Sequence, residues 1–538
     1  MPAPAEFYTH NFDHVLAWVR QHHSHLIDPA LGRWMRAVDG LSEGARHLLV
    51  RLLMRRGPHF RLDLLNYPGV TRVHYAALEL ALSGLAAIEA STSIRIASLR
   101  VPELEARLEA LGARQRGARR ALLRERLESC LAAGATVELP SVLRLGRGDD
   151  VACLRLLYFG SLRQDLSEFV LADIGALRWA QVGLAPKLPF AHASEVRRAV
   201  AVHRLADAVS SIEHGVRPRA KVELSFCRAL SDALADASPC RLTEARRARA
   251  LERVAHWQAR QGAHGGALRT LRRAASPGAR ERVCRLLAQR GRRKAAEALR
   301  AHMACAPQTD EEARFAARFD VAAVRCRPQR RGASIPVRRL YLRPLREARV
   351  EQRVVEHYRA GGNRALHLEN RLPGMLFMLT CWDIVFSPLP GAFVQPFQAG
   401  PTDLYTEDFW ARRREAIEAR LEAVRCGVYG VEDCLGVLER ELGTVNPFWG
   451  WQGAGVVPHI LRSIPRGVRA GICELVAREP RRARVGFPDL TIANGAPSCL
   501  AFIEVKGPGD QLRESQRRWL EDLQALGVRA EVLEVRFP

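Results

Sequence analysis

The sequence lacks the signatures of several protein classes. It has no run of about eighteen apolar residues that could span a bilayer as a helix, and no apolar secretory segment at the amino terminus. Its 12 cysteines are scattered and include no C-x-x-C pair, which argues against a zinc ribbon or a disulfide framework. The 17 histidines form no H-E-x-x-H motif. These absences predict a soluble cytoplasmic protein that does not act at a membrane.

Acidic residues are also scarce relative to basic ones. The chain carries 82 Lys and Arg against 58 Asp and Glu, which gives a formal net charge of +24. Such a charge favours a polyanionic partner and speeds the encounter with it. The codon bias of a GC-rich genome could supply part of the arginine, so the charge favours nucleic acid without identifying a substrate.

The most informative pattern lies near the carboxyl terminus. Asp489 follows Pro488 and precedes the short apolar run 490–493, which ends at an Asn-Gly turn signal. The next apolar run ends in Glu504-Val505-Lys506, fifteen positions after Asp489. The two runs are predicted to form a hairpin that returns Glu504 beside Asp489. Glu504 and Lys506 have the same parity along their strand, so they point to the same face.

Two carboxylates and a lysine in this arrangement predict a metal-dependent phosphodiesterase. Neighbouring carboxylates repel each other and a buried charge is costly, so a divalent cation would resolve the conflict. Oxygen ligands without a Cys/His cluster suit Mg²⁺ or Mn²⁺. One metal, or two roughly 3.5–4 Å apart, would activate a water and the scissile phosphate, with Lys506 facing the reacting oxygen. Each motif alone is more often a turn or a surface ion pair, but their spacing together favours the site.

A helix is predicted after the second strand, from Arg513 to Leu526, with Gly527 as its stop. Gln516 lies about one turn before the apolar Trp519, from where it could reach back towards the metal site. A final strand, Ala530 to Val535, closes the unit.

These motifs resemble the PD-(D/E)xK nucleases, in particular their VRR-NUC branch. Upstream, the chain resembles the nuclease domain of the Fanconi-associated nuclease family, here as a bacterial member, over about residues 340–538. The segments that carry this second resemblance are His367 to Asn370, Leu376 to Phe386, Thr402 to Tyr405, and Phe409 to Arg414.

The resemblance implies roles for individual residues. Asp489 and Glu504 would bind the metal together with the backbone carbonyl of Val505, and Lys506 would be the catalytic lysine. Glu369 matches an additional metal-binding glutamate of the family. Without the resemblance, Glu369 is better explained as an acid at a helix amino terminus, where the helix dipole contributes about 0.3–1 kcal/mol. Ser515 stands where some relatives have a basic residue, so a basic pocket for a 5′ phosphate is not implied.

The resemblance further implies 5′-flap endonuclease and 5′-to-3′ exonuclease activity on branched or flapped double-stranded DNA, in repair such as that of interstrand crosslinks. The protein would then work at the nucleoid; the sequence indicates no protein partners. Two alternatives are a non-catalytic scaffold that binds DNA structures and a junction-resolving nuclease. The presence of all four charged residues, Glu369, Asp489, Glu504 and Lys506, favours the enzyme.

The predicted architecture is a series of largely α-helical regions followed by an α/β nuclease domain. The regions are a winged-helix-like domain (1–95), a SAP-like module (96–135), a TPR-like helical domain (150–335) and the nuclease domain (340–538). Residues 1–95 contain two amphipathic runs, Leu48 to Arg56 and Tyr75 to Ile88. The arginines of the first run either lie near DNA or solvate one helix face.

The SAP-like module consists of two predicted short helices with a basic junction between them. The first begins at Pro102 and ends at Gly112, and the second contains Leu123 and Leu127. Basic residues at the junction are predicted to bind DNA phosphates, namely Arg114, Arg116, Arg119, Arg120 and Arg124. Further on, the helical segments 267–274, 280–289 and 294–302 have a spacing near that of helical-hairpin repeats.

Overall fold

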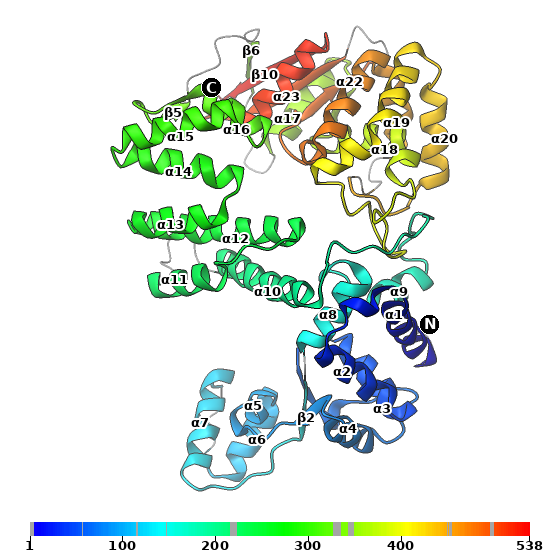
Figure 1. The fold of residues 1–538 in the computed structure, drawn as a ribbon, viewed down its shortest axis with the longest axis vertical. Coiled ribbons are helices and arrows are strands. Elements are labelled where there is room, and N and C mark those ends of the chain that lie inside the picture. The colour runs from blue at the N-terminus through cyan, green and yellow to red at the C-terminus, as the bar shows by residue number, and fades with distance from the viewer. Residues whose placement is uncertain are drawn as a thin grey trace. The chain divides into compact units, whose positions relative to one another are not determined.

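The computed structural model describes residues 5–55, 57–113, 117–146, 148–215, 223–326, 335–342, 349–448, 450, 454–494 and 500–537. The chain folds into two compact units, traced in Figure 1. The amino-terminal unit comprises Met1–Asp173 and Leu188–Ala316, and the carboxyl-terminal unit comprises Ile174–Lys187 and Ala317–Pro538. Among the described residues, no helix is long and apolar enough to cross a membrane.

The amino-terminal unit begins with four helices beside a small antiparallel sheet. The helices are α1 (Ala5–His23), α2 (Pro29–Asp39), α3 (Glu43–Leu53) and α4 (Val73–Leu82), with the short helices η1 (Ser24–Leu26) and η2 (Leu62–Leu64). The sheet has the order β1-β3-β2, from β1 (His59–Arg61), β2 (Ala86–Ile88) and β3 (Val142–Leu145). Apolar side chains such as Leu16, Trp34 and Leu48 form the core of this region.

The amphipathic run from Tyr75 to Ile88 spans most of a helix and a short strand. Helix α4 ends at Leu82, and residues 86–88 form strand β2. The chain reverses at Gly84, whose φ of +73° lies in the left-handed region that glycine adopts without strain. The carbonyl and N–H groups of β2 then pair with β3, a partner too distant in sequence for local periodicity to reveal.

Three helices are inserted between β2 and β3. They are α5 (Thr92–Ala97), α6 (Val101–Ala110) and α7 (Arg120–Ala132). Their apolar residues form a separate core in which Leu104 and Leu108 of α6 meet Leu123 and Leu127 of α7. Strand β3 follows both of the first two predicted domains in sequence, yet it pairs with β1 and β2 and so completes their sheet. The limits of those two domains remain predictions.

The rest of the amino-terminal unit is helical. Its helices are α8 (Gly148–Phe159), α9 (Ser167–Asp173), α10 (Ala193–Gly215), α11 (Leu224–Ala233), α12 (Arg241–Arg260), α13 (His264–Ala274), α14 (Pro277–Gln289), α15 (Arg293–Cys305) and most of α16 (Asp310–Arg318). From α11 to α15, each helix packs against the next in sequence, as in helical-repeat proteins. Gly262 and Gly291, both with positive φ, follow the ends of α12 and α14.

The carboxyl-terminal unit is built on a five-stranded mixed sheet of order β6-β10-β9-β8-β7. Its strands are β6 (Val337–Tyr341), β7 (Ala365–His367), β8 (Leu490–Ile492), β9 (Ala501–Lys506) and β10 (Arg529–Arg536). Strands β8 and β9 are antiparallel, as the predicted hairpin requires, and β10 runs parallel to β9 and β6. A separate two-stranded ribbon consists of β4 (Phe319–Asp320) and β5 (Arg325–Cys326).

Helices cover both faces of this sheet. Helix α17 (Val350–Ala360) packs Val354 and Val355 against one face. The other face belongs to a larger core shared with α18 (Arg371–Val385), α19 (Glu407–Cys426), α20 (Val431–Glu441), η3 (Ala454–Val456), α21 (Val457–Ser463), α22 (Arg466–Arg478), η4 (Pro480–Arg484) and α23 (Glu514–Ala525). This confirms the predicted fold class of helical regions followed by an α/β domain.

The alternation of side chains along β9 assigns its residues to the two faces. Ala501, Ile503 and Val505 lie in the core beneath α17, whereas Phe502 lies in the core shared with α18 and α23. Glu504 and Lys506 have the parity of Phe502 and therefore face the same side as α23.

A glycine fixes the loop that leads into β8. Gly486 has a φ of +82°, and a Cβ at this position would lie 2.6 Å from the backbone carbon of Ser515 at the start of α23. The loop can therefore approach α23 closely only because residue 486 has no side chain. Phe487 follows directly and packs edge-on against Trp519 of α23, with the ring centroids 5.0 Å apart.

Gly486→Ala is expected to destabilise the carboxyl-terminal unit by about 3 kcal/mol, because backbone strain and a backbone clash add together. Gly509→Ala is the matched control, since Gly509 has a φ of +84° with open space around its Cβ position. The control should lose only about 1 kcal/mol. Urea unfolding followed by tryptophan fluorescence measures both, and equal losses would contradict the close-approach explanation.

Candidate active site

Asp489 and Glu504 lie at the adjoining ends of β8 and β9. The antiparallel register pairs Leu490 with Ile503, and continuing it by one residue sets Asp489 opposite Glu504. The backbone N–H of Val505 donates a hydrogen bond of 2.8 Å to Oδ2 of Asp489. Two carboxylates are thus brought together by strand pairing, at the position that the sequence predicted.

Lys506 and Gln516 hold one oxygen of Glu504. The Lys506 Nζ lies 2.8 Å from Glu504 Oε1, and Gln516 Nε2 donates to the same oxygen at 2.5 Å. Lys506 also donates to Gln516 Oε1 at 3.0 Å. Gln516 comes from the first turn of α23, where its Oε1 also accepts the backbone N–H of Arg513 as part of a capping box. The helix therefore begins where its glutamine can orient the acid.

The other oxygen of Glu504, Oε2, is buried and has no hydrogen-bond partner. The residue is only 1% exposed. Burial, and then the negative charge of Asp489, raise the pKa of Glu504 to about 7 despite the opposing effect of Lys506. Burial is also the largest cause that raises the pKa of Asp489, against the hydrogen bond from Val505. The positive charge of Lys506 and the hydrogen bond from Val505 therefore do not fully compensate the negative charges of the two acids.

Glu369 lies next to these acids, but not inside a helix. It precedes α18 and has a φ of +44°, a left-handed conformation that is unfavourable for a non-glycine residue. Its N–H donates to the backbone oxygen of Asp489 at 3.4 Å, and its negative charge contributes to the raised pKa of Asp489. The explanation as a helix-terminal acid does not fit this position, because α18 starts only at Arg371.

Glu351 is an acid near the site that the sequence analysis did not single out. It lies in the first turn of α17, and its negative charge raises the pKa of Asp489 more than that of Glu369 does. The preceding Val350 approaches Gly507, with its Cγ2 3.8 Å from the Cβ position of that glycine. The start of α17 therefore lies beside the end of β9. No local motif marks Glu351, because α17 is far from β8 and β9 in sequence.

These residues fit a divalent cation by their chemistry. All the candidate donors are oxygens, and the buried Glu504 Oε2 is available to a ligand. A cation would also offset the charges that raise the two pKa values. Within the described residues, however, no three His, Cys, Asp or Glu side chains are gathered closely enough to form a closed metal site. The roles of Asp489, Glu504, Glu369 and the Val505 carbonyl as ligands therefore remain predictions.

The predicted DNA-binding arginines lie in the amino-terminal unit. Arg119 is the N-cap residue of α7, Arg120 starts that helix, and Arg124 follows one turn later. Arg120 donates to the backbone oxygens of Ala97 and Leu99. Arg114 and Arg116 fall outside the described residues. DNA binding by this group remains a prediction.

Comparison with known proteins finds similarity over the whole chain. Two family models match, "FAN1, HTH domain" over residues 6–87 and "VRR-NUC domain" over residues 432–537. The Fanconi-associated nuclease 1 homolog of Pseudomonas aeruginosa is 31% identical, with 97% of this chain and 94% of that protein covered. The Fanconi-associated nuclease 1 of Danio rerio is 34% identical, over 35% of this chain and 20% of that protein. A crystal structure of paFAN1 bound to 2nt 5′ flap DNA with gap matches with a TM-score of 0.86 at 29% identity, covering 100% of this chain and 99% of that one.

Asp489→Asn is expected to stabilise the metal-free protein at pH 8 by about 1 kcal/mol while abolishing cleavage. The raised pKa of Asp489 means that ionising it costs stability above the pKa of the unfolded chain, and asparagine keeps the acceptor for Val505 N–H. The gain should disappear as the pH falls below about 4, where the unfolded acid is also protonated. Thermal unfolding in EDTA measures it; a less stable variant at pH 8 would contradict this account.

Glu351→Gln is expected to weaken the apparent affinity for Mn²⁺ by about threefold to tenfold, because it removes a negative charge close to Asp489. Glu356→Gln is the matched control, an exposed glutamate of the same helix. Metal titrations followed by calorimetry and by cleavage rate give two independent readouts. Equal affinities for the two variants would show that Glu351 does not act on the site.

Proposed function

The chain belongs to the Fanconi-associated nuclease family and is a structure-specific nuclease, and we propose that it has 5′-flap endonuclease and 5′-to-3′ exonuclease activity on DNA. The observation that carries the proposal is the group formed by Asp489, Glu504, Lys506 and Gln516 at the adjoining ends of β8 and β9. The segment of the chain that the VRR-NUC model matches, residues 432–537, contains all four residues. Strand pairing and a helix start hold these side chains, so the group is preorganised for chemistry.

The contacts suggest a division of labour within the group. Lys506 and Gln516 occupy Glu504 Oε1 and leave Oε2 free, so they orient the acid for a ligand on its other side. Asp489, Glu504 and Glu369, with the carbonyl of Val505, would hold Mg²⁺ or Mn²⁺. When bound, the ion would polarise the scissile phosphate and lower the pKa of a bound water. Lys506 would place its positive charge beside the oxygen on which negative charge develops.

The substrate proposal draws on the relatives and on charge. Two solved relatives, both paFAN1, are bound to 5′ flap DNA with a gap, one with a 2-nucleotide and one with a 1-nucleotide flap. The net charge of +24 favours a polyanionic substrate of that kind. We extend the proposal to branched or flapped duplex DNA at the nucleoid, in repair such as that of interstrand crosslinks. A non-catalytic scaffold is disfavoured because the two acids, the lysine and the glutamine retain mutual contacts.

Cleavage of end-labelled 5′-flap, 3′-flap, forked and plain duplex DNA tests the proposal, with Mg²⁺, Mn²⁺ or EDTA. We expect metal-dependent cutting near the 5′-flap junction, and a loss of about a hundredfold or more in Asp489→Ala. Glu439→Ala, at an exposed position of α20, is the matched control and should cut normally.

Each other outcome has a defined meaning. Binding without cutting under every metal would favour the scaffold, and equal cutting of the two flap polarities would remove the 5′ preference. Faster cutting of a four-way junction than of flaps, in an added reaction, would favour the junction-resolving alternative.

A further inference from the structure

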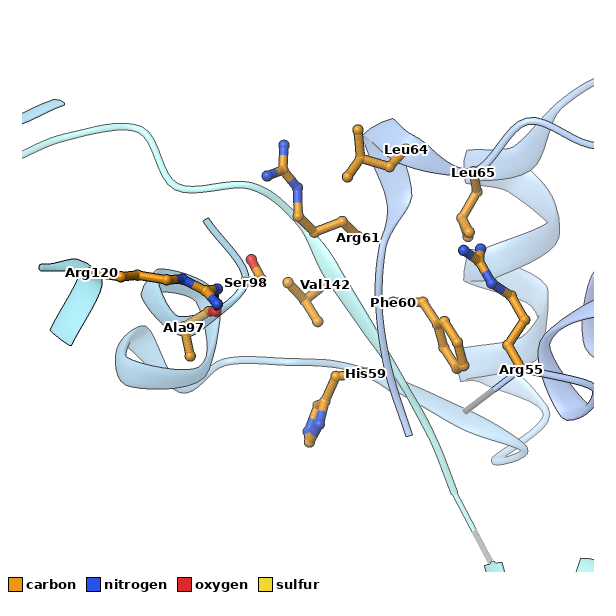
Figure 2. Close-up of a pocket in the computed structure, with 10 residues that line it drawn as sticks. All are labelled: Arg55, His59, Phe60, Arg61, Leu64, Leu65, Ala97, Ser98, Arg120 and Val142. Carbon is orange, nitrogen blue, oxygen red and sulfur yellow. Dashed lines mark hydrogen bonds between the residues drawn. The ribbon is translucent and has the colours of Figure 1, made fainter. Parts of the chain in front are cut away.

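A pocket of about 520 Å³ lies within the amino-terminal unit, where the three-stranded sheet meets the helices inserted between β2 and β3 (Figure 2). Residues of β1, β3, the end of α5 and the start of α7 line it. Figure 2 shows Arg120 on one side and Arg55 on the other, with Phe60 and Val142 between them. No predicted domain contains the whole pocket, because Val142 lies beyond residues 1–135.

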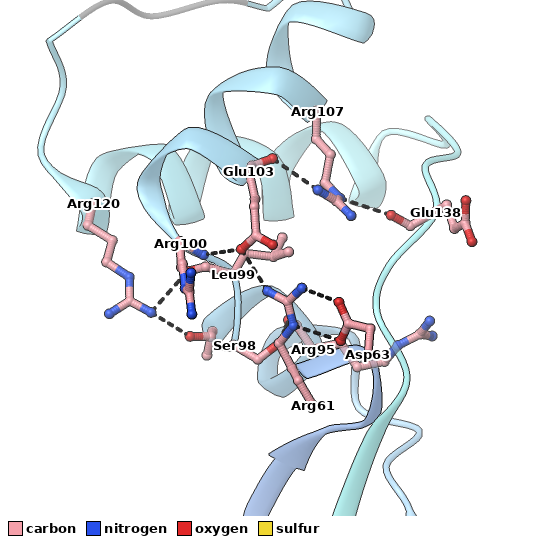
Figure 3. Close-up of polar contacts among 11 residues, drawn as sticks. Arg61, Asp63, Arg95, Ser98, Leu99, Arg100, Glu103, Arg107, Arg120 and Glu138 are labelled. Atoms are coloured by element: carbon pink, nitrogen blue, oxygen red, sulfur yellow. Dashed lines mark hydrogen bonds and ion pairs between the residues drawn. The ribbon is translucent and has the colours of Figure 1, made fainter. Parts of the chain in front are cut away.

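Arg61 shapes the pocket but contributes little net charge to it. Its guanidinium contacts both Asp63 and Glu103 of α6 (Figure 3), at distances of 2.5 and 2.6 Å. The hydrogen bond from Arg61 is the main cause that lowers the pKa of Glu103 to about 2. Glu103 also accepts the backbone N–H of Arg100 at the start of α6. This network ties the sheet to the inserted helices and fixes the width of the pocket.

Arg55 and Arg120 differ from Arg61 in having no acidic partner among the described residues. Arg55 donates to the Tyr67 hydroxyl at 2.8 Å, and Arg120 donates to the backbone oxygens of Ala97 and Leu99 at 2.8 and 3.0 Å. These neutral acceptors position the two guanidinium groups without cancelling their charges. Both side chains are exposed, so a phosphate can reach them.

The lining between the two arginines combines apolar side chains with the polar His59 and Ser98. Phe60 and Val142 are buried residues of the sheet, Leu65 is also buried, and Leu64 is 48% exposed. The Arg55 guanidinium carbon lies 5.9 Å from the centroid of the Phe60 ring. A concave lining that is partly apolar and is flanked by uncompensated arginines matches the two parts of a nucleotide, a base and a phosphate.

We propose that this pocket binds an unpaired nucleotide of the DNA substrate, with the base against the exposed Leu64 and the accessible edge of Phe60, and the adjoining phosphates at Arg55 and Arg120. The proposal rests on the proposed function, because its ligand is part of a flapped or branched DNA. A base in a duplex is stacked on both faces and cannot enter such a pocket. The pocket would therefore help to distinguish DNA with a single-stranded arm from plain duplex.

Equilibrium binding in EDTA tests the proposal without cleavage. The probes are a fluorescent duplex with a single-stranded 5′ arm and the same duplex without the arm. We expect the wild-type protein to bind the armed duplex about tenfold more tightly. The double variant Arg55→Gln, Arg120→Gln should lose this preference, whereas the matched control Arg126→Gln, at an exposed position of α7, should keep it.

Arg120 also supports α5 through its two backbone contacts, so its loss could disturb folding. Arg55→Gln alone keeps the test valid, because the hydrogen bond of the Arg55 side chain lies at the surface and joins it to Tyr67 rather than to the inserted helices. In that variant the preference for the armed duplex should fall from about tenfold to about threefold. Thermal unfolding of each variant checks that the helices remain folded.

Further probes separate the possible ligands. An arm of abasic residues keeps the phosphates and should bind more weakly than the normal arm; binding as tight as that of the normal arm would overturn the placement of the base. Equal loss of affinity for both duplexes in the double variant would show contact with duplex backbone, and no loss for either would exclude the pocket. Displacement of the armed probe by excess thymidine monophosphate alone would point to a free nucleotide as the ligand instead.

These outcomes are distinguishable from a failure of the proposed function. Loss of the arm preference in the variants with no metal-dependent cleavage in the wild-type protein would refute the nuclease proposal alone. Normal 5′-flap cleavage with unchanged binding in the variants would refute the pocket alone.

Discussion

The proximity of two carboxylates at the ends of β8 and β9 is the constraint on which the carboxyl-terminal unit depends. Strand pairing sets Asp489 opposite Glu504, and burial of Glu504 makes its negative charge costly. Lys506 and Gln516 compensate only part of that cost, and the N–H of Val505 donates to Asp489 instead. The negative charge that remains uncompensated favours a bound cation. Because the charged site itself costs stability, the surrounding fold must supply it.

The two cores around the sheet supply that stability. Alternate residues of β9 enter opposite cores: Ala501, Ile503 and Val505 lie in one, and Phe502, on the face of Glu504, lies in the other. Trp519 of α23 packs against Phe487 in the loop before Asp489. The same helix therefore packs the core and delivers Gln516 to the acid. Rigid packing of this kind holds like charges close together when they would otherwise separate.

Arginines in the amino-terminal unit serve two physical purposes, which explains why net charge alone says little about binding. Arg61, Arg197 and Arg247 are paired with carboxylates and connect elements of the fold. Arg55 and Arg120 are held by neutral oxygens and keep their charge available. Arginines without an acidic partner therefore contribute most to the electrostatic attraction of DNA. The net charge of the whole sequence overstates the contribution of the arginines that are paired with acids.

The sequence by itself determined the features that depend on short-range spacing. The period of two along β9 places Glu504 and Lys506 on one face, the turn between two apolar runs predicts the hairpin, and helical spacing brings Gln516 within reach. Only the tertiary structure decided the contacts between distant segments. Glu351 approaches Asp489 because α17 packs beside β9, Glu369 adopts a left-handed backbone before α18, and β3 completes a sheet with β2 across three inserted helices. Such contacts arise from the packing of whole elements, which no local periodicity of the chain encodes.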